Sequence, residues 1–242
     1  MRADIVEQLL ADNDFRVTLA GLRLPGGSRL GVLGASMSVD AVDWVTLLSD
    51  VLAAARPHVE LVDHCSIGCT TADALVALPG LISQRPNHIL IMLGVDDARR
   101  HGAASGVLRV STAETHRNLS VLRAMAQAEA HVGTTLITPP PAHPRREQFA
   151  DSYWLAEDLS SVVNVVRSID PDAVCLRTGT PPGQDYWLAD GVRPSAVGHT
   201  DIVRRIINHF SRAHQGEESG RPRIDAASRS MAPNTPTAAS RG

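Results

Sequence analysis

Asp190 and Arg193 lie three residues apart in a segment that could complete a catalytic site, directly before Pro194 and a helical pattern. An Asp three residues before a His can orient an imidazole, which accepts the proton of a serine hydroxyl near neutral pH. The position of that His holds Arg193, whose guanidinium stays protonated because its pKa is above ~12. The segment therefore predicts a catalytic acid at Asp190 and a missing general base.

Ser36 is the candidate nucleophile. It follows Gly34 and Ala35 at the end of an apolar run, where a strand would turn into a helix. A serine in such a turn can expose its hydroxyl and direct its backbone N–H at the same reacting oxygen. The alternative is that Ser36 caps the following helix or merely sits in a turn.

Two further loops carry candidate oxyanion contacts. Gly68 follows the second apolar run and could donate its backbone N–H, with Thr70 or Thr71 capping the next helix. Asp96 follows the third run, where its side chain would face the same crevice; alternatively, it begins a helix, favoured there by the helix dipole. We expect both loops beside the serine, because ligands of open α/β sheets bind at the carboxyl ends of the strands.

The elements that must position these residues follow from the apolar pattern. Short apolar runs predict buried parallel strands, and segments with apolar residues at steps of three and four predict the helices between them. This alternation predicts an α/β fold, a three-layer α/β/α sandwich with a five-stranded parallel sheet. The predicted strands cover residues 30–33, 59–62, 88–93, 134–138 and 173–176, and the helices 40–55, 71–84, 112–130, 151–169 and 195–212, the last capped by Ser195.

In order and spacing, these loops resemble the SGNH (GDSL-type) esterase and acylhydrolase superfamily, which has a flavodoxin-like fold. The runs 93–102 and 138–141 are similar to actinobacterial members. The resemblance places the nucleophile and one oxyanion donor on Ser36 and a second donor on Gly68. It places the family's asparagine donor on Asp96, the acid on Asp190 and the histidine base on Arg193.

The sequence departs from the family pattern at Ala35, Asp96 and Arg193. Ala35 replaces a carboxylate that mainly organises the loop. An ionised Asp96 accepts hydrogen bonds but cannot donate them to an oxyanion, and losing one such donor costs ~10²–10³ in rate. Losing a triad member leaves only about 10³–10⁴ over water. We hypothesise that Arg193 pairs with Asp190, Asp96 or both, so that no buried charge stands alone.

The functional prediction is a hydrolase-like protein acting on an ester or acyl group through Ser36, with His199 as the nearest substitute base. One alternative is a catalytically impaired pseudoenzyme that binds an anionic small molecule through Arg193. The other is a repurposed transferase, lyase or cyclase of specialised metabolism, with Asp96 as the base and Arg193 as an anion clamp. The expected partner is a small-molecule or carrier-bound acyl substrate.

Composition restricts the remaining possibilities. A net charge of -3 without a basic stripe predicts neither nucleic acid nor a membrane surface as a partner, and no apolar run could span a bilayer. We expect no cofactor, and no metal site either, because His64, Cys65 and Cys69 lack a second ligand pair. Three cysteines fit a reducing compartment and a cytoplasmic location.

The predicted organisation has three parts. Residues 1–28 form an N-terminal extension packed on the domain, with a helix at 3–11 and a small hairpin or edge strand at 15–24. The SGNH hydrolase-like domain covers 29–213. Residues 214–242 contain few apolar residues and are expected to form a disordered tail.

Overall fold

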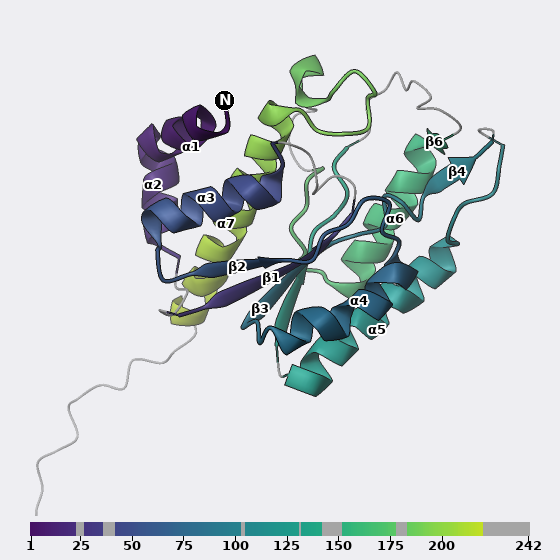
Figure 1. The fold of residues 1–242 in the computed structure, drawn as a ribbon, viewed down its shortest axis with the longest axis horizontal. Helices are drawn as coiled ribbons and strands as arrows, with labels where there is room; N and C mark the ends of the chain where they lie inside the picture. The colour runs from purple at the N-terminus through teal and green to yellow at the C-terminus, as the bar shows by residue number, and fades with distance from the viewer. Residues whose placement is uncertain are drawn as a thin grey trace, which may run out of the picture.

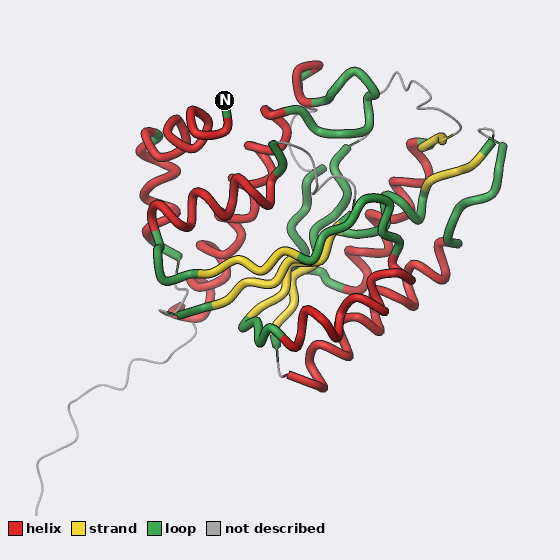
Figure 2. The backbone as a smooth tube through the Cα atoms, in the orientation of Figure 1, coloured by secondary structure: helices red, strands yellow, loops and turns green. Residues whose placement is uncertain are grey.

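A parallel sheet of four strands forms the centre of the molecule (Figures 1 and 2). The structure is a computed structural model that describes residues 1–22, 27–35, 42–102, 105–130, 132–141, 152–177 and 183–219. Parallel pairing joins neighbours in the order β2-β1-β3-β5. The strands are β1 (Arg29–Gly34), β2 (Glu60–Asp63), β3 (His88–Met92) and β5 (Gly133–Leu136).

Helices cover both faces of this sheet (Figure 1), which confirms the predicted α/β/α sandwich. Each face has its own cluster of buried apolar side chains. On one face, α3 (Trp44–Ala55) and α7 (Ala196–Ser219) lie beside α1 (Arg2–Ala11) and α2 (Asn13–Ala20). The other face carries α4 (Thr71–Ser83), α5 (Thr112–Ala130) and α6 (Ala156–Ile169).

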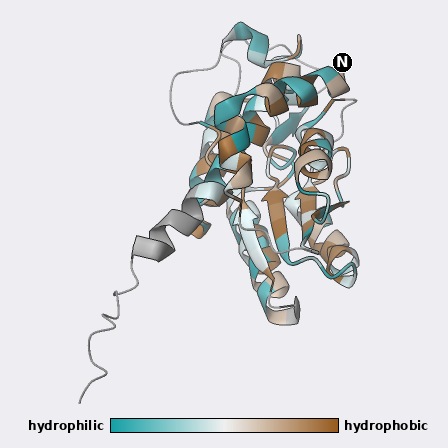
Figure 3. Ribbon diagram, turned by 90° about the vertical axis from the view of Figure 1, so that its left-hand side faces the viewer, coloured by the Kyte–Doolittle hydropathy of each residue, from teal (hydrophilic) through white to brown (hydrophobic). Residues whose placement is uncertain are grey.

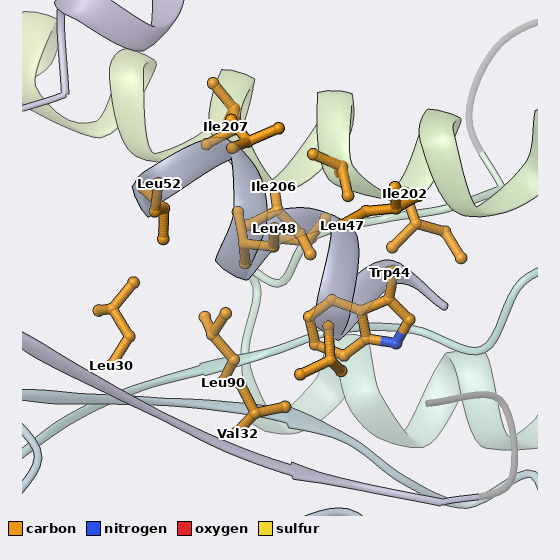
Figure 4. Close-up of a cluster of buried hydrophobic side chains, with 14 of the residues drawn as sticks. Leu30, Val32, Trp44, Leu47, Leu48, Leu52, Leu90, Ile202, Ile206 and Ile207 are labelled. Atoms are coloured by element: carbon orange, nitrogen blue, oxygen red, sulfur yellow. The ribbon is translucent and has the colours of Figure 1, made fainter. Parts of the chain in front are cut away.

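Alternation along β1 explains why both faces need helices. Val32 belongs to the cluster under α3 and α7, whereas Leu33 belongs to the opposite cluster, and both are fully buried. Successive strand side chains point to opposite faces, so a continuous apolar run must be covered twice. Figure 4 shows the first cluster, where Trp44 and Leu48 of α3 gather with Ile202 and Ile206 of α7 above the strands. Hydrophobic colour is correspondingly prominent on the central strands in Figure 3.

The fifth predicted strand, 173–176, is reduced to one isolated parallel bridge between Ile137 and Val174. Side-chain oxygens accept hydrogen bonds from backbone N–H groups that a longer ladder would pair with backbone carbonyls. The N–H of Leu136 donates to Asp170 Oδ2 at 3.0 Å, and the N–H of Leu176 donates to Thr138 Oγ1 at 2.9 Å. The ladder therefore stops after a single residue at this edge.

The predicted hairpin at 15–24 is wrong, because α2 occupies most of this segment. The Asp12 side chain caps α2 by accepting hydrogen bonds from the N–H groups of Asp14 and Phe15. Phe15 and Leu19 are buried one helical turn apart, whereas Val17 between them is 65% exposed. The apolar residues thus follow the period of a helix rather than that of a strand.

The predicted helix 151–169 begins later than expected, at Ala156. The preceding residues form β6 (Ser152–Trp154), which pairs antiparallel with β4 (Arg99–His101). This two-stranded sheet lies apart from the main sheet in Figure 1. It fixes the segment that follows β3, where Asp96 lies.

The last helix is capped as predicted and is longer than predicted. Ser195 Oγ accepts hydrogen bonds from the N–H groups of Val197 and Gly198 at 3.1 and 3.4 Å. The helix α7 continues past the predicted domain boundary at residue 213 to Ser219. Within the described residues, no helix is both long and apolar enough to cross a membrane.

Truncation of a core side chain should destabilise this sandwich strongly. Leu48 is 1% exposed in the cluster of Figure 4, so we expect Leu48→Ala to lower the free energy of unfolding by about 2–5 kcal/mol. Val76 on α4 is 83% exposed, and Val76→Ala should change it by less than about 0.5 kcal/mol. Chemical denaturation measures both changes, and equal effects would contradict this description of the core.

Candidate active site

The loops after β1, β2 and β3 leave the same edge of the sheet, since these strands are parallel. Ala35 directly follows β1 and is buried in the cluster under α4 and α5. Ser36, the predicted nucleophile, lies outside the described residues. The helix α3 is capped by Asp43, whose Oδ1 accepts the N–H of Thr46 at 2.8 Å, and not by Ser36.

Gly68 lies in the loop after β2 with a backbone φ of 72°. This left-handed conformation is costly for residues with a Cβ, which is a physical reason for glycine here. Thr70 closes the loop as the predicted cap of α4, in a capping box with Asp73. The Gly68 carbonyl accepts a hydrogen bond from Arg109 Nη1 at 2.9 Å.

Asp96 is buried, with 1% of its side chain exposed, in a turn rather than at the start of a helix. Two arginines lie within ion-pair distance of its carboxylate. Arg99 Nη1 is 3.6 Å from Asp96 Oδ1, and Arg109 Nη1 is 3.9 Å from the same oxygen. These arginines, which sequence reasoning did not identify, offset the charge that Asp96 brings into the loop.

Asp97 anchors this loop to two helices, a role that the sequence pattern did not predict. Its carboxylate accepts hydrogen bonds from the Thr71 N–H at 2.8 Å, the Thr71 hydroxyl at 2.6 Å and the Thr115 hydroxyl at 2.8 Å. Asn118 Nδ2 donates in turn to the Thr71 hydroxyl at 3.1 Å. Burial raises the pKa of Asp97 even though these hydrogen bonds oppose the shift. Asp97 therefore ties the loop after β3 to the starts of α4 and α5.

Asp190 and Arg193 form a direct ion pair. Arg193 Nε is 2.6 Å from Asp190 Oδ2, within the pairing range that our hypothesis requires. Asp190 Oδ1 also accepts the N–H groups of Val192 and Arg193, both at 2.9 Å. Burial would raise the pKa of Asp190, but these hydrogen bonds outweigh it and the net pKa is lowered. The Asp190 carboxylate is thus engaged by the Arg193 side chain and by two backbone N–H groups.

The turn between these residues is held from both sides. Gly191 has a φ of 65°, a conformation that suits glycine, and its N–H donates to the Leu188 carbonyl. The N–H of Ser195 donates to the Tyr186 carbonyl at 2.8 Å, and Trp187 Nε1 donates to the Pro141 carbonyl at 2.9 Å. Asp190 and Arg193 are therefore presented by an anchored loop that follows the short 3-10 helix η2 (Gln184–Tyr186).

His199, the predicted substitute base, lies in α7 and is 1% exposed. Neither ring nitrogen has a hydrogen-bond partner among the described residues. Burial lowers the pKa of His199 to about 4. Among the described residues no carboxylate orients its imidazole, and its lowered pKa makes it a weak base.

The titratable residues of the described chain do not suggest a metal centre. No group of three or more His, Cys, Asp or Glu side chains within it could hold a metal ion. His64 and Cys65 are partly buried, and Cys69 is buried with its pKa raised by desolvation. The raised pKa disfavours the thiolate that a metal or a nucleophilic reaction would use.

The fold matches solved hydrolase structures. Neither a protein-family model nor a curated protein matches the sequence. The lipase/acylhydrolase from Enterococcus faecalis superposes with a TM-score of 0.61 at 21% identity, covering 77% of this chain and 96% of that one. A GDSL-like lipase from Bacteroides thetaiotaomicron gives 0.59 at 18% identity, over 83% and 97%. The esterase EstA from a Pseudoalteromonas species gives 0.56 at 20% identity, over 78% and 99%. The chain therefore has the fold of these lipases and esterases.

Removing the Arg193 charge should raise the pKa of Asp190. Arg193→Gln deletes the guanidinium and leaves the backbone donors at 192 and 193. Fewer interactions would then oppose the increase in the Asp190 pKa that burial causes. A carbon-13 NMR titration of the Asp190 carboxyl group measures the change. Arg117→Gln, which removes an exposed arginine paired with Glu114 on α5, is the matched control and should not move this pKa. An unchanged Asp190 pKa in Arg193→Gln would contradict the ion pair.

Burial of neutral His199 should make stability depend on pH. Its pKa falls from 6.5 to about 4 on folding, so the unfolded chain binds more protons between these values. The contribution of neutral His199 to the free energy of unfolding is full above pH 6.5 and is lost as the pH falls towards about 4. Over this range the free energy of unfolding changes by at most ~1.4 kcal/mol per pH unit.

Chemical denaturation at several pH values tests this slope. We expect His199→Leu to unfold with a shallower pH dependence than the unsubstituted chain. His88, whose pKa is also lowered to about 4, remains as a background contribution in both proteins. Identical slopes would show that His199 does not titrate in this way.

Proposed function

We propose that this chain is an SGNH/GDSL-type, hydrolase-like protein that acts on an ester or acyl group through Ser36, with Arg193 in place of the usual histidine base. The main support for this proposal is the anchored Asp190–Arg193 pair. It keeps the acid of the family pattern and has a cation at the position of the base. The fold shared with esterases and acylhydrolases supports the same assignment.

In this proposal Ser36 and Gly68 supply the acyl site. The Ser36 hydroxyl oxygen attacks the carbonyl carbon while its proton passes to water, and the backbone N–H groups of Ser36 and Gly68 donate to the oxyanion that forms. Collapse of this intermediate breaks the bond to the leaving group, which departs as a protonated alcohol or thiol, and water then hydrolyses the acyl-serine. The left-handed backbone of Gly68 and the Arg109 contact to its carbonyl hold the second loop in one conformation. An acyl substrate, either a small molecule or carrier-bound, would meet these groups at the carboxyl edge of the sheet.

The arginine limits the rate of this chemistry. A guanidinium stays protonated at neutral pH and cannot accept the serine proton, and the Asp190 carboxylate is engaged by Arg193 rather than by an imidazole. Binding and oxyanion contacts without a complete triad give about 10³–10⁴ over water. We therefore expect slow acyl transfer from Ser36 and weak turnover.

A second candidate is a binding protein for an anionic small molecule. The specific observation is that the Arg193 side chain is 38% exposed while it pairs with Asp190. A planar guanidinium matches carboxylate and phosphate groups through paired N–H donors. A ligand carboxylate or phosphate at this arginine would be held without being cleaved.

Serine labelling and restoration of the histidine separate the two candidates. A phosphonate is a suitable probe because the Pseudoalteromonas esterase is described as inhibited by monoethylphosphonate. We expect a fluorophosphonate to label Ser36, located by mass spectrometry, and not to label Ser36→Ala. Arg193→His should raise hydrolysis of p-nitrophenyl acetate by roughly 10²–10⁴, the usual contribution of a general base.

Arg117→His is the control for adding a histidine elsewhere, and it should bring no gain in hydrolysis. Circular dichroism confirms that each variant is folded. An absence of labelling together with no gain in folded Arg193→His would overturn the proposed acyl chemistry at Ser36. That outcome would leave the binding protein as the supported function.

A further inference from the structure

Arg99 and Arg109 bring two guanidinium groups to the same place beside the Gly68 loop. Their segments adjoin, since the N–H of Arg109 donates to the carbonyl of Arg99 at 2.9 Å. Their side chains are 22% and 26% exposed, so both are largely covered and both still reach solvent. Arg109 also contacts the Gly68 carbonyl, which puts the pair next to a candidate oxyanion donor.

The hydrogen-bonding capacity of these arginines is mostly unused within the described chain. The Arg99 guanidinium donates no hydrogen bond to a described residue, and its Nε atom is buried without a partner there. Among the described residues, the Arg109 guanidinium donates one hydrogen bond, to the Gly68 carbonyl. Guanidinium groups present five donors in a fixed fork, and covered donors in proteins normally have partners. The two side chains thus leave an array of donors that a ligand could satisfy.

The local charges favour an anion at this array. Asp96 is the one carboxylate of the described residues within ion-pair distance of both arginines, and these distances of 3.6 and 3.9 Å exceed hydrogen-bond length. Asp73 is engaged in the capping box of α4, and Asp97 is engaged by the two threonines. Within the described residues, the two guanidinium groups therefore share one carboxylate at ion-pair distance, and Asp73 adds a weaker electrostatic attraction to Arg109.

We propose that Arg99 and Arg109 form a binding site for an oxyanion, the carboxylate or phosphate group of a ligand, at the carboxyl edge of the sheet beside Gly68. A planar guanidinium fork matches both groups through paired N–H donors. Given the proposed acyl chemistry, the substrate class becomes an ester or acyl compound that carries a negative charge. The anion site itself does not depend on turnover.

Titration of the full-length chain with two small anions tests the site. Sodium succinate and inorganic phosphate are added at constant ionic strength, and binding is followed by calorimetry and by the Arg99 Nε–Hε signal in nitrogen-15 NMR. We expect at least one anion to bind and to shift this signal, and uncharged succinamide to do neither. The anion that binds with the higher affinity shows whether the site prefers a carboxylate or a phosphate group.

Substitutions locate the binding. Arg99→Gln and Arg109→Gln should each weaken it by about tenfold or more, because each loses charge-assisted hydrogen bonds. Arg99→Lys keeps the charge without the fork and should weaken it less. Arg117→Gln on α5 should leave the affinity unchanged. Binding of neither anion, or equal affinity in folded Arg99→Gln and the unsubstituted chain, would overturn the site.

Ser36→Ala separates this inference from the proposed function. The anion site predicts that Ser36→Ala binds the same anion with unchanged affinity. If fluorophosphonate labelling fails while this binding persists, the acyl chemistry is wrong and the anion site stands. If labelling succeeds while neither anion binds, the acyl chemistry stands and the two arginines serve only to offset Asp96.

Discussion

The parallel pairing of β1 with both β2 and β3 is the constraint on which the rest of the structure depends. It sends the loops that follow these strands to one edge of the sheet, where Ala35, Gly68 and Asp96 lie. Because β1 is buried on both faces, it also demands a helical layer on each side. The same pairing thus determines the sandwich and the edge at which chemistry can occur.

Asp97 converts that edge into a defined arrangement of loops. A buried carboxylate is costly unless it is fully hydrogen-bonded, and here Thr71 and Thr115 supply the donors from the starts of α4 and α5. The neighbouring Asp96 is consequently fixed relative to the helix that follows Gly68. The position of Asp96 therefore depends on an adjacent residue that has a structural role.

The charged side chains of Asp96 and Arg193 are each balanced close by. Arg193 pairs with Asp190 in the turn before α7, and Asp96 is flanked by Arg99 and Arg109 after β3. Each loop therefore limits the cost of its own buried charge. The arrangement places arginines in two loops, one after β3 and one before α7.

Sequence alone determined the layers of the fold and which loops carry polar side chains, because apolar runs and helical spacing record burial directly. It also indicated the Asp190–Arg193 pair, since a three-residue spacing around a glycine turn brings the side chains together. It did not determine α2. Phe15, Val17 and Leu19 alternate with other residues as in a strand, but the segment forms a helix that the Asp12 side chain caps. The single-bridge edge at Val174 and the pairing of Asp96 with Arg109 arose only in the tertiary structure. These features join residues distant in sequence, so no local pattern encodes them.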